Sequence, residues 1–173
     1  MMYYATIKKT DVANGPGVRV SLFVSGCTHA CKGCFNSEAW DFAYGQPFTE
    51  ETMEELLKAL SPDYIRGFSV LGGEPMEPQN RETVCRILET VKASYPQKDV
   101  WCYTGYDYEK DILRWESEDA VITKLLGLID VLVDGEFVEE RKNLRLAFRG
   151  SENQRLIDIK KSRTAGRVIC LNE

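Results

Sequence analysis

Long apolar runs are missing from this sequence. No segment approaches the about 18 consecutive apolar residues of a membrane-spanning helix. Residues 1–9 also contain no apolar stretch ahead of a cleavage site, as a secretory leader would. We therefore expect a cytoplasmic protein without membrane association. With 173 residues, 43% of them hydrophobic and 28% charged, the chain is long enough for one domain, and we predict a single domain over 1–173.

Positive charge is also scarce. The net charge of -5 argues against a general nucleic-acid binder, although residues 139–163 hold eight Lys or Arg against four Asp or Glu. A disulfide framework is not indicated either, because three of the six cysteines lie within eight residues and nothing points to secretion. Reduced thiols that hold a metal are the better interpretation.

The cysteine motif lacks a fourth cysteine. Cys27, Cys31 and Cys34 lie in the run Gly-Cys-Thr-His-Ala-Cys-Lys-Gly-Cys-Phe-Asn. Four cysteines would close a 4Fe-4S cluster, whereas three leave one iron able to bind something that is not protein. The alternative is a structural zinc site completed by His29 or by a distant cysteine, although zinc motifs usually pair two cysteines with a second pair elsewhere. His29 is the only histidine, and we expect it to be exposed.

The rest of the chain alternates predicted strands and helices. Strands are expected at 18–24, 68–71, 100–103 and 129–133, and helices from Thr49 to the Ser61-Pro62 stop, around 84–95 and between 108 and 128. This order favours a parallel sheet with right-handed crossovers, whose ligand site lies at the carboxyl ends of the strands. The predicted strand ends are Cys27, Gly72, Thr104 and Asp134.

Gly72-Gly73-Glu74-Pro75 follows the second of these strands. Two glycines at a strand end let a ligand approach the backbone, and Glu74 offers a carboxylate to a cationic group. The alternative is a plain strand-to-helix connection with Pro75 in the first turn of the helix. The combination with an open cluster favours the ligand-binding interpretation.

Together, Cys-x3-Cys-x2-Cys-aromatic and Gly-Gly-Glu-Pro resemble the motifs of radical S-adenosylmethionine enzymes. More narrowly, the chain resembles the activating proteins of anaerobic ribonucleotide reductases. The segments that carry this resemblance are Asn14–Arg19, Phe23–Cys27, Gly33–Asn36, Gly45–Phe48, Tyr103–Tyr106, Val131–Gly135 and Phe148–Arg155. Phe35 departs from the pattern, in which tyrosine is frequent at that position.

The resemblance implies a fold and a set of cofactor contacts. The fold is α/β, a partial (incomplete) β/α barrel of mostly parallel strands, because a full barrel takes about 250 residues. Cys27, Cys31 and Cys34 would ligate a 4Fe-4S cluster, and S-adenosylmethionine would chelate the fourth iron. The turn formed by Gly72, Gly73 and Glu74 would meet its methionyl amino group, and Gly33, Cys34 and Phe35 would lie near its adenine.

The resemblance also implies a reaction. Reductive cleavage of S-adenosylmethionine would lead to a glycyl radical on the anaerobic ribonucleotide reductase, with an electron donor such as reduced flavodoxin. No side chain need act as acid or base. Two alternatives are an activator of another glycyl-radical enzyme, such as pyruvate formate-lyase, and a non-catalytic zinc or iron-sulfur binding module.

The remaining cysteines and the basic residues suggest structural roles. Cys85, Cys102 and Cys170 each have apolar neighbours and are interpreted as small buried hydrophobes. The arginines from Arg141 to Arg155 are interpreted as a solvated charged segment.

Overall fold

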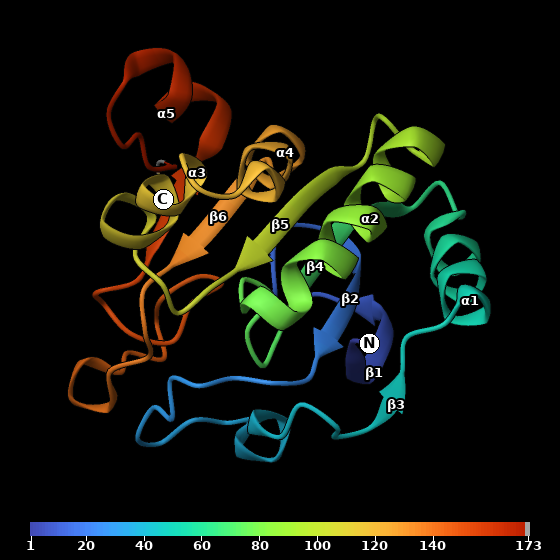
Figure 1. Cartoon of the computed structure of the whole chain (residues 1–173), viewed down its shortest axis with the longest axis horizontal. Helices are drawn as coiled ribbons and strands as arrows, with labels where there is room; N and C mark the ends of the chain where they lie inside the picture. The colour runs from blue at the N-terminus through green and yellow to red at the C-terminus, as the bar shows by residue number, and fades with distance from the viewer. Residues whose placement is uncertain (172–173) are drawn as a thin grey trace.

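The computed structural model describes residues 1–171, which contain one seven-stranded sheet of order β3-β1-β2-β4-β5-β6-β7 (Figure 1). The strands are β1 (Tyr3–Asp11), β2 (Val18–Val24), β3 (Gln46–Pro47), β4 (Ile65–Gly72), β5 (Asp99–Tyr103), β6 (Val131–Asp134) and β7 (Arg155–Asp158). The α-helices are α1 (Glu50–Leu60), α2 (Pro78–Ser94), α3 (Leu113–Glu116), α4 (Ala120–Leu128) and α5 (Ile159–Ala165). Short helical turns lie at η1 (Ser37–Trp40), the π-helix η2 (Tyr108–Ile112) and η3 (Glu139–Arg141).

The centre of the sheet is parallel. β2 pairs with β4, β4 with β5 and β5 with β6, all in parallel register. Alternate side chains of these strands, such as Leu22, Val70 and Leu132, are fully buried in the main hydrophobic core. Helices α1, α2 and α4 contribute Leu56, Leu88 and further apolar residues to that core and cover this face of the sheet (Figure 1). Strands separated by helices were predicted from the sequence, and this part of the prediction is confirmed.

The outer strands are antiparallel, so the sheet is mixed. β1 pairs antiparallel with β2 and with β3, and β7 pairs antiparallel with β6. β1 joins β2 through the short Asn14-Gly-Pro-Gly17 turn, and β7 follows β6 without an intervening α-helix. Neither connection contains the helical crossover that parallel pairing requires. The predicted mostly parallel arrangement therefore holds only for the four central strands.

Two strands begin at other residues than predicted. β4 begins at Ile65 rather than at Phe68. The last parallel strand begins at Val131 rather than at Ile129, because Ile129 is the C-cap of α4. Thr49 begins α1 as expected, and its hydroxyl accepts a hydrogen bond from the N–H of Thr52. Within residues 1–171, none of the helices combines the length and apolar character needed to cross a bilayer.

The second face of the sheet holds a smaller apolar cluster. Trp101, Val131, Val133 and Leu156 are buried there, and Tyr103 and Phe148 pack against them. The Tyr103 hydroxyl donates a 2.6 Å hydrogen bond to the carbonyl of Phe148. The segment after β6 is thereby held across this face.

Candidate functional site

The carboxyl ends of the four parallel strands border one cavity. Cys27 after β2, Gly72 at the end of β4, Thr104 after β5 and Gly135 after β6 all line it, and its volume is about 550 Å³. The connections that follow β2 and β6 lie at the same end of the sheet, beyond the arrowheads (Figure 1). A cavity therefore lies at the edge of the sheet where the sequence predicted a ligand site.

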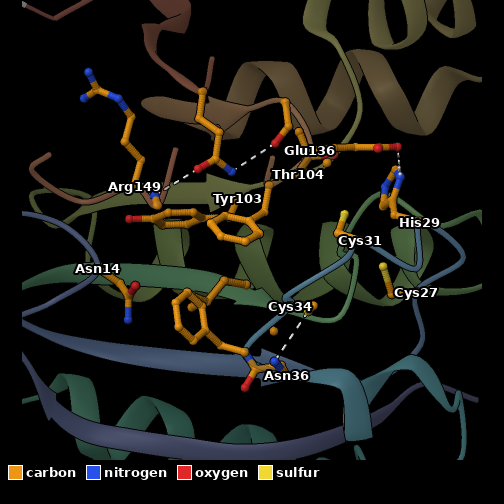
Figure 2. A pocket seen from close by; sticks show the side chains of 18 of the residues that line it. Asn14, Cys27, His29, Cys31, Cys34, Asn36, Tyr103, Thr104, Glu136 and Arg149 are labelled. Carbon is orange, nitrogen blue, oxygen red and sulfur yellow. Dashed lines mark hydrogen bonds and ion pairs between the residues drawn. The ribbon is translucent and has the colours of Figure 1, made fainter. Parts of the chain in front are cut away.

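The three motif cysteines all line this cavity. Cys27, Cys31 and Cys34 are partly exposed and have free thiols, as Figure 2 shows. In the described part of the chain, no three Cys, His, Asp or Glu side chains are grouped closely enough to hold one metal ion. Both nitrogens of the His29 ring lie against carboxylates, those of Glu74 and Glu136, rather than against the thiols, which disfavours the zinc alternative completed by His29.

Burial keeps two of these thiols protonated. It raises the pKa of Cys27 to about 12, and the carboxylates of Glu74 and Glu77 act in the same direction. Burial also raises the pKa of Cys31, with a contribution from Glu136. Because thiolates are the metal ligands, loading the site must release these protons.

The two glycines of the Gly-Gly-Glu-Pro turn pack against the start of the cysteine loop. Gly73 donates a 2.7 Å hydrogen bond to the Val24 carbonyl, and the N–H of Glu74 donates a 2.8 Å bond to the Gly26 carbonyl. A Cβ at Gly73 would lie 2.6 Å from that same Gly26 oxygen. Gly72 has a φ of +110°, in the region that favours glycine. The turn and the loop therefore meet backbone to backbone, with both glycines facing the cavity.

The Glu74 carboxylate is buried and fully engaged by the protein. It accepts hydrogen bonds from the N–H groups of Gly105 at 2.6 Å and Met76 at 2.8 Å. The Thr104 hydroxyl approaches both of its oxygens, and His29 Nε2 lies 2.8 Å away. The cationic group that this carboxylate meets in the structure is thus the His29 ring.

His29 is not exposed, which corrects the expectation from sequence. Its side chain is only 8% exposed, and its Nδ1 lies 3.0 Å from Glu136 (Figure 2). Burial lowers its pKa, but the hydrogen bonds and charges of Glu74 and Glu136 outweigh this and raise the pKa to about 9. The loop brings His29 against residues far away in sequence, and periodicity cannot reveal such contacts.

The second half of the cysteine loop is more open. Phe35 is 71% exposed, its ring centroid lies 5.7 Å from that of Phe137, and the Lys142 ammonium lies 5.2 Å from the Phe35 ring centroid. Cys34 accepts a 3.4 Å hydrogen bond from the N–H of Asn36 (Figure 2). Gly33 has a φ of +78° and lies beside Glu139, outside the cavity lining. Of the residues predicted near adenine, Cys34 and Phe35 therefore border the cavity, whereas Gly33 lies in the turn between Cys31 and Cys34.

Several lining residues were not singled out from the sequence. Asn14, Tyr103, Phe148 and Arg149 also line the cavity. Figure 2 shows Asn14 and Arg149 on the side of the cavity away from Cys27 and Cys31. All of them lie in segments that carry the family resemblance, and that was the signal available for finding them.

Comparison with known proteins is consistent with this geometry. A family model described as "4Fe-4S single cluster domain" matches residues 13–157. An anaerobic ribonucleoside-triphosphate reductase-activating protein of enterobacteria phage T4 is 44% identical over 155 residues, which cover 90% of this chain and 93% of the relative. Proteins of the same name from Vibrio cholerae and Escherichia coli K12 are 43% and 39% identical, each over 88% of this chain and 96% of the relative.

The chain belongs to this family of activating proteins. Its remaining cysteines lie away from the cavity. Cys85 and Cys102 are buried, as expected for small hydrophobes. Cys170 is exposed, contrary to the prediction. Its neighbours Ile169 and Leu171 bond to the backbone of β7, which is the edge strand of the sheet, so the segment lies along that edge rather than inside the core.

Asp134 has a structural role in this family member. It is buried, accepts hydrogen bonds from Arg155 at 2.6 and 3.0 Å, and accepts another from the N–H of Tyr108. Asp134 itself does not line the cavity, whereas its neighbour Gly135 does. Arg155 is accordingly paired within the fold, whereas Arg141 and Arg145 are exposed, as the sequence indicated.

Proposed function

We propose that this chain is a radical S-adenosylmethionine activating enzyme that generates a glycyl radical on an anaerobic ribonucleotide reductase. The observation that carries this proposal is that the three motif thiols and the Gly72-Gly73 turn border one cavity at the carboxyl end of the parallel strands. The names of the relatives support the choice of target.

Cys27, Cys31 and Cys34 would hold a 4Fe-4S cluster. The chain supplies three thiols at this cavity, so one iron of such a cluster would stay open to S-adenosylmethionine. When bound and reduced, the cluster would supply one electron to the sulfonium of S-adenosylmethionine, whose S–C5' bond would break to give methionine and a 5'-deoxyadenosyl radical that would take a hydrogen atom from a glycine of the target.

The residues of the chain would position the cofactor. Gly72 and Gly73 have no side chains and so present only backbone to the cavity, and we assign the methionyl amino group to the Gly72–Glu74 turn. We assign the adenine to the strip from Gly33 through Cys34 to Phe35. Glu74 would act through its hydrogen bonds to Gly105 and Met76, which hold the turn in place.

The target would complete the site. The cavity is bordered by Phe35, 71% exposed, and by Leu144, 87% exposed, on opposite connections. A radical is useful only where its target is close and water is excluded. We propose that the glycine-bearing segment of the reductase covers these apolar side chains when it enters.

The fold and cellular setting follow from the same proposal. We propose that residues 1–173 form a single radical S-adenosylmethionine domain whose sheet is a partial β/α barrel with its central strands parallel. Reduced flavodoxin is the proposed electron donor, and the cytoplasm is the proposed location.

Electron paramagnetic resonance of anaerobically reconstituted, reduced protein tests the proposal. Spectra would be recorded before and after addition of S-adenosylmethionine, and 5'-deoxyadenosine release would be assayed in the same sample. We expect a signal that shifts on addition, together with 5'-deoxyadenosine. An unshifted signal, or zinc at full occupancy, would support a binding module instead.

A second sample identifies the target. The same activated protein would be incubated with the anaerobic ribonucleotide reductase or with pyruvate formate-lyase, and the glycyl radical signal measured on each. We expect the radical on the reductase alone, and a signal only on the lyase would reassign the enzyme.

A further inference from the structure

We propose that His29 is a positioning residue that clamps the first half of the cysteine loop, between Cys27 and Cys31, to the ends of three other strands. The inference rests on the assignment of these cysteines to a cluster. It concerns how the chain holds the loop, and it assigns His29 no direct contact with the reacting atoms.

Both nitrogens of the His29 ring are bound. Nε2 lies 2.8 Å from Glu74, which follows β4, and Nδ1 lies 3.0 Å from Glu136, which follows β6. Glu74 is in turn bonded to Thr104 and Gly105, which follow β5. One side chain from the loop after β2 is thus connected to the carboxyl ends of β4, β5 and β6 (Figure 2).

The ring fits a site shaped for it. The ring makes a T-shaped contact with Tyr106, with the ring centroids 4.4 Å apart. A Cβ at Gly105 would lie 2.7 Å from two atoms of the His29 ring. Glycine at position 105 is therefore what leaves room for the imidazole beside Glu74.

The clamp lies where the loop is strained. Ala30, the next residue after His29, has a φ of +51°, in the left-handed region that non-glycine residues rarely occupy. Such a conformation persists only where surrounding contacts determine it. His29 on one side of Ala30 supplies such contacts, and Cys31 on the other side is a proposed ligand.

Thr28 is held from the same turn. Its N–H and its hydroxyl both donate to Glu77, at 3.0 and 2.7 Å. Glu74 and Glu77 thus hold two consecutive residues of the loop. Residues that orient metal ligands typically change metal affinity about 10- to 100-fold when they are removed.

Variants at three positions test the clamp. His29→Ala removes both bonds, Glu136→Ala removes one, and Glu136→Gln retains a carbonyl acceptor for Nδ1. Gly105→Ala pushes the ring aside without altering the loop sequence. Glu140→Gln, on an exposed residue of the same connection as Glu136, and Gly127→Ala, where nothing lies within 4 Å of the new Cβ, are the matched controls.

Two readouts separate the clamp from the proposed reaction. In the cluster-free chain, hydrogen exchange of residues 27–31 reports loop order directly. In the reconstituted chain, the rate of iron loss to a chelator reports how firmly the loop holds the cluster, and the electron paramagnetic resonance line shape of the reduced cluster reports the environment of its irons. Neither depends on S-adenosylmethionine cleavage, so a chain that holds its cluster but cleaves nothing would contradict the proposed function and still test the clamp.

We expect faster exchange at 27–31 and about 10- to 100-fold faster iron loss in His29→Ala and Gly105→Ala. Glu136→Ala should also exchange and lose iron faster than the unaltered chain, and Glu136→Gln should bring both rates back toward those of the unaltered chain. Both controls should match the unaltered chain in these rates. Where His29→Ala unfolds, His29→Gln is measured in its place. Unchanged exchange, iron retention and spectrum in both His29→Ala and Gly105→Ala would overturn the proposal.

Discussion

Glu77 binds Thr28 twice, through the backbone N–H at 3.0 Å and the side-chain hydroxyl at 2.7 Å. Glu77 lies at the start of α2, and Thr28 lies within the cysteine loop. A carboxylate that is only slightly exposed thus ties the helix after β4 to the loop after β2. We expect Glu77→Ala to lower the free energy of unfolding of the cluster-free chain by about 1–3 kcal/mol, since it leaves the Thr28 N–H without this acceptor. Urea denaturation measures this, and Glu82→Ala, an exposed change on the same helix, is the control.

Cys31→Ala tests the ligand assignment. We expect this chain to fold but to assemble no 4Fe-4S cluster, because Cys31 lies in a loop and outside the hydrophobic core. Iron and sulfide analysis after anaerobic reconstitution measures the loss, and circular dichroism checks the fold. Exposed Cys170→Ala should load normally. Full iron content in Cys31→Ala would refute the assignment.

Gly73→Ala tests the backbone contact between the turn and the loop. The added methyl would lie 2.6 Å from the Gly26 carbonyl oxygen and 2.9 Å from that of Ala39, neither of which can move without shifting the loop. We expect a loss of about 1–3 kcal/mol in the free energy of unfolding. Gly127→Ala in α4 has open space and should instead stabilise the chain by about 0.5–1 kcal/mol. Thermal or urea unfolding of both variants compares them, and equal stability would contradict the packing argument.

Asp11 should make stability depend on pH. Burial opposes its ionisation, but hydrogen bonds from Ser21, Ala13 and Asn14 outweigh this and hold its pKa below the ordinary 3.8. Because the folded-state pKa is the lower one, the ionised carboxylate stabilises the fold at neutral pH. That contribution is lost as the pH falls through the folded-state pKa.

Asp11→Asn isolates this contribution. We expect it to lower the free energy of unfolding by about 1–2 kcal/mol at pH 7 and to lose less stability than the unaltered chain as the pH falls below about 5. Urea denaturation at pH 7 and in acid measures both. A parallel loss of stability in the two chains would show that Asp11 contributes nothing to the pH dependence.

Local patterns predicted much of this fold. The β-branched run at 18–24, the Thr49 cap and the apolar period of α1 and α2 all report short-range preferences, and each appears in the structure as expected. β1 and β7 were not predicted, although both are ordered strands. Both lie toward the edges of the sheet. Burial alternates only weakly along β1, and β7 has only four residues, so neither gives a clear strand pattern in the sequence.

By itself the sequence predicted a 4Fe-4S site and a ligand-binding turn, because three cysteines at this spacing and a glycine turn at a strand end are local features, and the family model supports the first of these predictions. Only the tertiary structure decided what surrounds them. His29 was expected to face solvent, yet it lies between Glu74 and Glu136, which are 45 and 107 residues away along the chain. The reason is physical: parallel strands bring the ends of distant segments to one edge of the sheet, and the hydrogen bonds made there depend on that convergence rather than on any local pattern.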